Sequence, residues 1–306
     1  MKRYSTTLAV DHVSLYVRPG ECVALLGPNG AGKTSTCEML EGLLTPDEGT
    51  ISICGLGYAR NRREILELIG VQLQETQLYK KATVRETLQL FASFYRSSED
   101  LNGLLSATHL NNLENRRLEA LSGGQKQALY IACSLINRPR LLFLDEPSAG
   151  LDPEARRRIW ALIGQVKQSE RGIFLTTHYL EEAEKLADRV AIMFEGRLAA
   201  QDSPAGLIRT YCPGAVWGFS LDASAETLSA QRDYLKLHLP WLHHGVETQG
   251  GCELNSLEAS KQIQELTVVA RQKSIGVHSL YLRQSTLEDV FLKLTGRRLD
   301  ETHQRH

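Results

Sequence analysis

The feature that most constrains this chain is a glycine-rich segment, Gly-Pro-Asn-Gly-Ala-Gly-Lys-Thr, at residues 27–34. It follows a short, uniformly apolar run at residues 22–26, which predicts a strand buried on both faces of a parallel sheet. A strand, this loop and a helix in that order predict a phosphate-binding P-loop. Its glycines let backbone N–H groups close around phosphates, Lys33 supplies a positive charge, and the Thr34 hydroxyl reaches a magnesium ion.

Three further apolar runs, at residues 141–144, 173–176 and 190–193, resemble the first, with helix-length amphipathic segments between them. Alternation of strands and helices predicts a layered α/β core through about residue 200. Period-two alternation of Val13, Leu15 and Val17 predicts a half-exposed strand ahead of the P-loop.

Between residues 83 and 137 the pattern indicates helices alone. Thr83 and Glu86 have the spacing of a capping box, and the helix they open carries Leu88, Phe91 and Tyr95 on one face. The sequence therefore predicts a helical insert in the α/β core.

The C-terminal third carries no recognisable catalytic motif. Residues 211–214 have the composition of a linker, Leu257, Ile263, Leu266 and Ala270 suggest one helix, and Ser285-Thr286-Leu287-Glu288 caps another that ends at Gly296 and buries Leu287, Val290, Phe291 and Leu294. We expect a first domain at residues 1–210, with a helical subdomain at about 75–140, and a small α+β accessory domain at residues 211–306.

Charge and composition exclude several classes of function. The 35 Lys and Arg residues nearly cancel the 36 Asp and Glu residues, which argues against a surface built to coat nucleic acid or anionic lipid. Six cysteines without paired spacing fit buried thiols in a reducing cytosol. The apolar runs are far shorter than the roughly 20 residues of a membrane span, so any membrane work must go through a partner.

Residues 141–146 predict a strand that ends in two adjacent carboxylates, Asp145 and Glu146. The carboxyl ends of the strands in an open α/β sheet are where ligands bind. There Asp145 can serve magnesium, and Glu146 can orient or deprotonate the attacking water. The alternative is a solvated strand end, which the neighbouring P-loop makes the weaker interpretation.

Ser122, Gly123, Gly124 and Gln125 lie at a predicted helix start, about twenty residues before the Asp-Glu strand. Two glycines expose backbone donors where the helix dipole favours an anion. The spacing from Ser122 to Gln125 also fits a simple capping box, and taken alone that interpretation is preferred.

Together these segments resemble the ATP-binding subunits of ABC transporters. Residues 27–34 are similar to a Walker A motif, residues 121–125 to the ABC signature, and Asp145-Glu146 to Walker B with its catalytic glutamate. The resemblance covers about residues 4–205.

Three further positions resemble elements of this family: Gln74 the Q-loop glutamine, residues 148–152 the D-loop, and His178 the switch histidine. Taken singly, each is better interpreted as an ordinary loop amide, turn or helix cap, and it is their order along the chain that favours the functional interpretation. Tyr4 resembles the A-loop aromatic that stacks on adenine. The family usually has a further strand before this aromatic, whereas three residues precede Tyr4 here. Either the assigned start of the chain is late, or the edge of the ATP-binding subdomain is shortened.

The resemblance implies ATP and Mg²⁺ as cofactors. It assigns catalysis to Glu146, His178 and Gln74, and metal binding to Thr34, Gln74 and Asp145. The residues that it assigns to nucleotide binding are Gly27, Pro28, Asn29, Gly30, Ala31, Gly32, Lys33, Thr34, Ser35, Tyr4, Ser122, Gly123, Gly124, Gln125 and Asp152.

Residues 285–296 resemble the C-terminal signature of drug-resistance-type ABC exporter ATPases, which pair with type-two permeases. This implies an ATP-hydrolysing subunit that energises export through separate integral membrane permease subunits, at the cytoplasmic face of the cell membrane. It also implies a second ATP-binding subunit, as a head-to-tail homodimer, and no nucleic acid. The alternatives are a soluble ABC ATPase, whose usual second cassette or coiled coil we do not find, and an importer ATPase, which only the C-terminal signature argues against.

Overall fold

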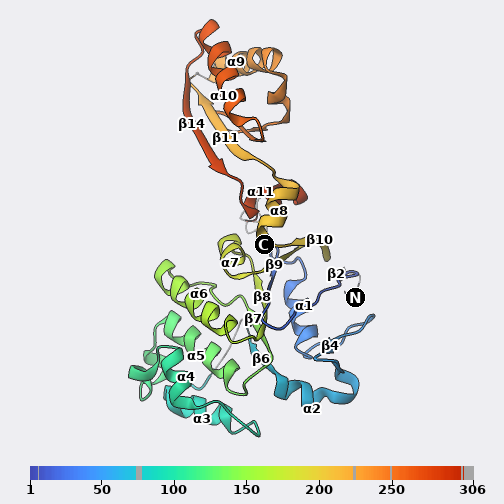
Figure 1. Cartoon of the computed structure of the whole chain (residues 1–306), viewed down its shortest axis with the longest axis vertical. Coiled ribbons are helices and arrows are strands. Elements are labelled where there is room, and N and C mark those ends of the chain that lie inside the picture. The colour runs from blue at the N-terminus through green and yellow to red at the C-terminus, as the bar shows by residue number, and fades with distance from the viewer. Residues whose placement is uncertain (6, 74–77, 223–224, 249, 298, 300–306) are drawn as a thin grey trace. The chain divides into compact units, whose positions relative to one another are not determined.

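The computed structural model describes residues 1–5, 7–73, 78–222, 225–248, 250–297 and 299. These residues fold into two compact units, each with its own sheet and hydrophobic core (Figure 1). The division falls between Pro204 and Ala205, so helix α8 (Pro204–Tyr211) belongs largely to the second unit. The segment expected to be a linker lies inside that unit, where Cys212 is buried and Lys293 Nζ donates a 2.6 Å hydrogen bond to the Tyr211 carbonyl.

A six-stranded sheet forms the centre of the first unit, in the order β10-β9-β3-β8-β7-β6. Neighbouring strands are parallel except for β10 and β9. The four apolar runs of the sequence form β3, β7, β8 and β9, which confirms the α/β fold class. The strands are β3 (Cys22–Leu26), β6 (Ile69–Gln72), β7 (Leu141–Asp145), β8 (Gly172–Thr177), β9 (Arg189–Phe194) and β10 (Arg197–Asp202).

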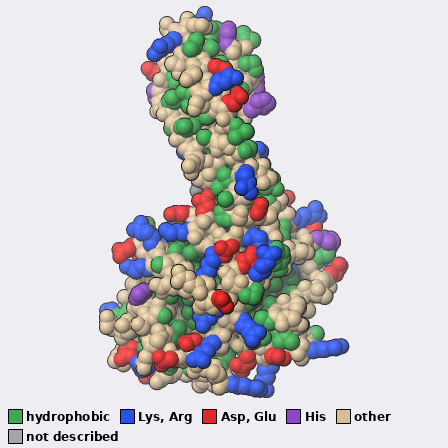
Figure 2. All heavy atoms as spheres, in the orientation of Figure 1, with side chains coloured by type: hydrophobic (Ala, Val, Ile, Leu, Met, Phe, Trp, Pro, Cys, Tyr) green, Lys and Arg blue, Asp and Glu red, His purple; other side chains and the backbone are tan. Residues whose placement is uncertain are grey.

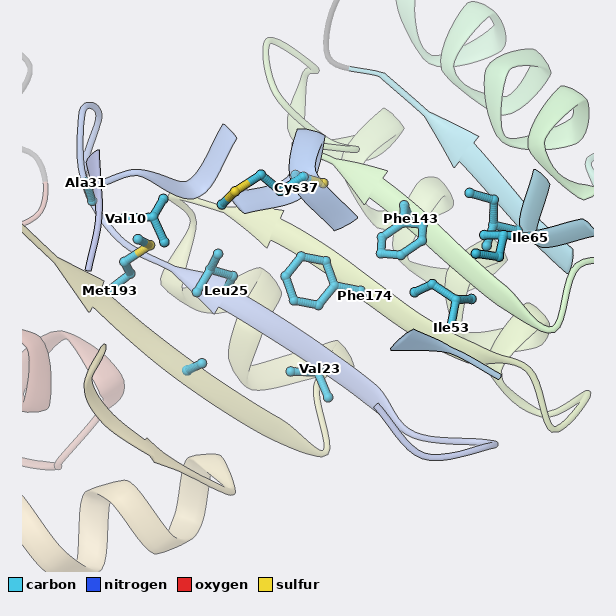
Figure 3. Packing of buried hydrophobic residues seen from close by; sticks show 13 residues of the cluster. Val10, Val23, Leu25, Ala31, Cys37, Ile53, Ile65, Phe143, Phe174 and Met193 are labelled. Carbon is cyan, nitrogen blue, oxygen red and sulfur yellow. The ribbon is translucent and has the colours of Figure 1, made fainter. Parts of the chain in front are cut away.

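The core of this unit lies between the sheet and its helices. Leu25, Phe174 and Phe143 lie in a row on neighbouring strands (Figure 3). Phe143 and Phe174 pack edge to face with ring centroids 5.9 Å apart, a favoured aromatic arrangement. The helices that accompany this sheet are α1 (Lys33–Leu40), α2 (Tyr58–Leu68), α6 (Pro153–Lys167) and α7 (Leu180–Leu186).

The segment expected to be a helical insert contains only helices among its assigned elements. Thr83 and Glu86 form the expected capping box, with Thr83 N donating to Glu86 Oε2 at 2.8 Å. The helix they open ends at Ala92, so Tyr95 lies beyond it. The helices are α3 (Val84–Ala92), α4 (Leu101–Ala107), η1 (Asn111–Leu113), η2 (Leu118–Ala120) and α5 (Gly123–Leu135).

The expected strand at residues 13–17 is not formed. Val13, Leu15 and Val17 do alternate with exposed neighbours and pack on the core, as the sequence pattern indicated. Alternation reports which side chains are buried, whereas a strand also needs a neighbour for its backbone hydrogen bonds. A cavity of about 710 Å³ borders both residues 15–19 and residues 52–54.

Two short antiparallel pairs complete the first unit. One is β1 (Lys2–Tyr4) with β2 (Thr7–Val10), and the other is β4 (Ser52–Ile53) with β5 (Leu56–Gly57). Basic and acidic side chains are interspersed across the visible face of this unit (Figure 2). In the described parts of the chain, no helix is both long and apolar enough to cross a bilayer.

The second unit is built on an antiparallel sheet in the order β12-β13-β11-β14. Trp217 and Phe219 on β11 anchor its core, and Trp217 Nε1 donates to Gln262 Oε1 of α10 at 3.1 Å. The elements are β11 (Ala215–Leu221), α9 (Ala225–His238), η3 (Pro240–His244), β12 (Val246–Glu247), β13 (Gly251–Ser256), α10 (Ala259–Gln272), β14 (Val277–Gln284) and α11 (Leu287–Thr295).

Both helices expected in this region are present. Helix α10 begins at Ala259, so Leu257, expected on its apolar face, lies outside it and is 78 % exposed. Helix α11 ends at Gly296 in the left-handed conformation and buries Leu287, Val290 and Phe291, as expected. Its capping box joins Thr286 to Asp289, one residue after the expected segment 285–288, and Leu294 is only partly buried.

Candidate nucleotide-binding site

The glycine-rich loop joins the end of β3 to the start of α1. A Cβ atom added at Gly27 would lie 2.3 Å from the Met193 carbonyl oxygen, and one at Gly32 would lie 2.2 Å from that of Ala9. Both positions therefore exclude any side chain. The loop is held against β9 and β2 by backbone contacts that only glycine allows.

Lys33 begins α1 and is 5 % exposed. Its Nζ donates to the Gly27 and Pro28 carbonyls at 2.8 and 3.1 Å and lies 3.8 Å from Glu146 Oε1. Burial lowers the pKa of Lys33, and the charges of Glu146 and Asp145 oppose this shift. An anion bound at the loop would stabilise the charged ammonium group.

Asp145 and Glu146 stand at the end of β7. The Thr176 hydroxyl of β8 donates to Asp145 Oδ1, and burial raises the pKa of Asp145. Glu146 has a φ of 49°, in the left-handed region that non-glycine residues rarely occupy. Its backbone N–H donates to the Thr176 hydroxyl at 3.1 Å, so the neighbouring strand holds this conformation.

His178 follows β8 directly, and its Nδ1 lies 3.1 Å from Glu146 Oε1. The side chains of both residues are at most 15 % exposed. The structure thus brings Lys33, Glu146 and His178 together from three different strand ends. Among the expected catalytic residues, Gln74 lies outside the described part of the chain.

A pocket of about 450 Å³ opens beside this cluster. Tyr4 reaches it from β1, and its Oη lies 3.3 Å from Ser35 Oγ of α1. The pocket therefore joins the expected aromatic to the P-loop and to the carboxylate of β7. Its lining residues are Tyr4, Ala9, Asn29, Gly30, Gly32, Lys33, Thr34, Ser35 and Glu146.

The start of α5 does not line this pocket. Ser122 is its N-cap and forms a capping box with Gln125, at 3.3 Å from Gln125 N to Ser122 Oγ. Asp152 caps α6 by accepting from Glu154 N and Ala155 N at 3.0 and 2.9 Å, and these bonds lower its pKa. The starts of α5 and α6 are neighbours, since a Cβ atom added at Gly124 would lie 2.8 Å from that of Ala155.

Sequence reasoning missed two polar residues that support the site. The Thr176 hydroxyl donates to the Asp145 carboxylate and accepts from the Glu146 backbone N–H, and Glu182 of α7 is completely buried. The available signal was weak: Thr176 is a polar residue at the end of an apolar run, and Glu182 is one of several acids in a helix that looks solvent-exposed.

Comparison with known proteins agrees with this geometry. Residues 10–149 match the family described as ABC transporter. The Nod factor export ATP-binding protein I of Burkholderia orbicola (strain AU 1054) is 37 % identical over 306 residues, which cover 98 % of this chain and 96 % of the relative. The protein of that name from Mesorhizobium japonicum is 37 % identical, covering 98 % and 86 %.

The chain belongs to the ABC transporter ATP-binding family. Among solved structures it is similar to an ATP-binding subunit of an ABC transporter, with 31 % identity, a TM-score of 0.62 and coverage of 74 % of this chain and 94 % of that one. It is also similar to the dimeric ATP-binding cassette MJ0796 bound to ADP and Pi, with 25 % identity, a TM-score of 0.58 and coverage of 64 % and 90 %. This member of the family is thus an ATP-binding ATPase with the P-loop fold.

Proposed function

We propose that this ABC ATPase hydrolyses ATP to drive export through a separate membrane permease. The observation that carries the ATPase proposal is the convergence of Lys33, Glu146 and His178 beside the P-loop pocket. The proposal of export is supported by relatives named for export whose similarity extends through the second unit.

The residues of the pocket have different roles in binding and hydrolysing ATP. Lys33 and the backbone of residues 27–34 bind the phosphates, with Ser35 in the first turn of α1, and Tyr4 contacts the adenine. Glu146 orients the attacking water and accepts its proton. His178, held beside Glu146, contacts the terminal phosphate. Gln74 is assigned to the same reaction by resemblance.

The oxygen donors at the pocket fit a magnesium ion. Thr34 and Asp145 supply a hydroxyl and a carboxylate, and Mg²⁺ is usually held by one or two carboxylates together with phosphates and water. Among the described residues no group of three or more His, Cys, Asp and Glu gathers as an all-protein metal site. When bound, the ion neutralises charge on the phosphates.

The second half of the site comes from another copy of the chain. Ser122, Gly123, Gly124 and Gln125 form a helix start suited to an anion but lie outside the pocket. In a head-to-tail dimer each copy applies this helix start, together with Asp152 of the neighbouring α6, to the nucleotide held by its partner. The dimeric form of the solved relative supports this arrangement.

An exposed apolar groove offers a docking surface for the permease. Leu43, Leu66, Leu73 and Phe94 line a hollow of about 660 Å³, and each is at least 39 % exposed. Exposed apolar surface of this kind marks interaction sites. Docking here would hold the chain at the cytoplasmic face of the membrane. The cargo would then contact the permease rather than this chain. The relatives are named for export of a Nod factor.

The proposal is tested by purifying the chain from membranes of its source and identifying what accompanies it. We expect a multi-span permease, ATPase activity that needs Mg²⁺, and ATP-dependent accumulation of cargo in inside-out vesicles. Phe94→Asp should weaken co-purification and leave the ATPase activity of the isolated chain unchanged. Recovery with a ribosome, or with a permease that moves cargo inward, would replace export with one of the alternatives.

A further inference from the structure

Glu182 is a completely buried carboxylic acid that the proposed mechanism does not use. It lies in the first turn of α7, and its Oε1 accepts a 2.8 Å hydrogen bond from the Trp160 indole of α6. Burial raises the pKa of Glu182, while the neighbouring Thr177 and Ser148 hydroxyls and the Trp160 indole lower it. The second carboxyl oxygen, Oε2, and the Ser148 hydroxyl are buried without a hydrogen-bond partner. Burying a carboxylic acid lowers stability unless the group is hydrogen-bonded, so an apolar side chain would fill this space at a lower cost in stability.

The groups around Glu182 come from the two loops that carry the reactive side chains and from α6. Thr177 immediately precedes His178, and Ser148 lies two residues after Glu146. Both hydroxyl-bearing residues are completely buried. Trp160 lies on α6, the helix that follows the Ser148 loop. One carboxyl group is therefore surrounded by groups from both sides of the His178–Glu146 contact.

We propose that Glu182 is a positioning residue that fixes the loop of His178 against the loop of Glu146, and so sets the 3.1 Å approach of their side chains. It acts through its hydrogen bond from Trp160, which joins α7 to α6, and through its position beside the Thr177 and Ser148 hydroxyls, without touching nucleotide. The inference rests on the proposed ATPase function. Glutamine keeps an acceptor for the indole and offers an amide group to the neighbouring hydroxyls, whereas leucine fills the space without either.

This role predicts a separation of kinetic constants. The P-loop and Tyr4, which bind ATP in the proposed site, lie on β1, β3 and α1, away from the partners of Glu182. Displacing His178 from Glu146 should therefore lower kcat and leave KM for ATP nearly unchanged. A residue needed only for folding would instead lower the melting temperature and leave the kcat of the folded fraction intact.

The experiment measures steady-state ATPase kinetics and thermal melting of Glu182→Gln and Glu182→Leu. We expect Glu182→Gln to keep kcat within about threefold of the wild type, and Glu182→Leu to lose at least about tenfold in kcat with KM within about twofold. Glu181→Leu, exposed on the same helix, is the matched control and should retain wild-type kinetics. Inactive wild-type protein would contradict the proposed function, whereas an active wild type with unchanged kcat in Glu182→Leu would overturn only the role of Glu182.

A second variant covers the case in which Glu182→Leu does not fold. Trp160→Phe removes the indole donor and keeps an aromatic ring in the core, so it should lower kcat by a smaller factor with unchanged KM. Combined with Glu182→Gln, its effect should be less than additive, because both changes act on one hydrogen-bonded group. A fully active Trp160→Phe, or effects that add independently, would overturn the inference.

Discussion

Glu146 shows at the residue scale how the fold sets chemistry. Its positive φ and its backbone bond to Thr176 turn its carboxylate to within 3.1 Å of His178 Nδ1 and 3.8 Å of Lys33 Nζ. The adjacent Asp145 is held to β8 instead. In the proposed mechanism these two neighbouring carboxylates have different tasks, one at the metal ion and one at the attacking water.

Replacing Glu146 by Gln should remove the base and keep the shape of the side chain. We expect ATP binding to persist while turnover falls on the order of 10²–10⁴-fold. The measurement is single-turnover hydrolysis together with nucleotide retention. Near-normal turnover in this variant would exclude Glu146 as the base.

Contacts to the phosphates should contribute more to ATP affinity than the contact to adenine. Lys33→Ala removes the buried cation and should abolish productive ATP binding, whereas Tyr4→Ala should weaken affinity by about tenfold, equivalent to ~1.4 kcal/mol of stacking. Equilibrium titration with ATP compares the two variants, and Tyr4→Phe is the control that keeps the ring. If Tyr4→Ala binds ATP as the wild type does, Tyr4 does not contact adenine.

Glu41 should make stability depend on pH. It is 3 % exposed, and burial raises its pKa from 4.5 to about 7. A carboxyl group with a raised folded-state pKa favours folding at low pH, and this contribution is lost as pH rises from about 4.5 through about 7. Glu41→Gln should therefore raise the melting temperature more at pH 8 than at pH 5. The exposed Glu64→Gln on α2 is the control, and an equal gain at both pH values would contradict the burial argument.

At the scale of elements, the helix starts are fixed by close packing. A methyl group at Gly124 would lie 2.8 Å from the Ala155 side chain, so Gly124→Ala should force α5 and α6 apart and destabilise the fold by about 1–3 kcal/mol. Gly164, inside α6 with no atom within 4 Å of an added Cβ, is the matched control. Gly164→Ala should stabilise by about 0.5–1 kcal/mol.

Chemical denaturation measures both variants, and Ala155→Gly should partly rescue Gly124→Ala by removing the opposing methyl group. A neutral Gly124→Ala would show that the two helix starts adjust without strain. The same packing argument explains why the start of α5 belongs with α6 and Asp152 rather than with the pocket of its own chain.

At the scale of the whole molecule, the proposed shared site can be tested by mixing two inactive variants. Lys33→Ala damages the pocket, and Ser122→Arg damages the helix start supplied to the partner. In a head-to-tail heterodimer both defects fall in one site and leave the other intact. We expect an ATP-dependent dimer with nucleotide occluded at one site only after mixing, measured by size-exclusion chromatography with bound nucleotide. If each variant behaves in the mixture as it does alone, the sites are not shared.

Much of the first unit could be predicted from sequence because its signals are local. Uniform apolar runs located β3, β7, β8 and β9, capping patterns located the starts of α3, α5 and α11, and the glycine-rich segment located the loop that joins β3 to α1. The strand expected at residues 13–17 failed because backbone pairing depends on a neighbour far away in the chain, which periodicity does not report.

The sequence alone therefore determined the α/β class, the ATPase family and the order of the motifs, since each depends on residues close together in the chain. Only the tertiary structure decided which of those motifs meet. It brought Glu146 Oε1 to 3.8 Å from Lys33 Nζ and to 3.1 Å from His178 Nδ1, left Ser122 outside their pocket, and joined the buried Glu182 of α7 to Trp160 of α6. The physical reason is that distances between strand ends are set by sheet order and by helix packing, both of which join segments separated by tens to more than a hundred residues.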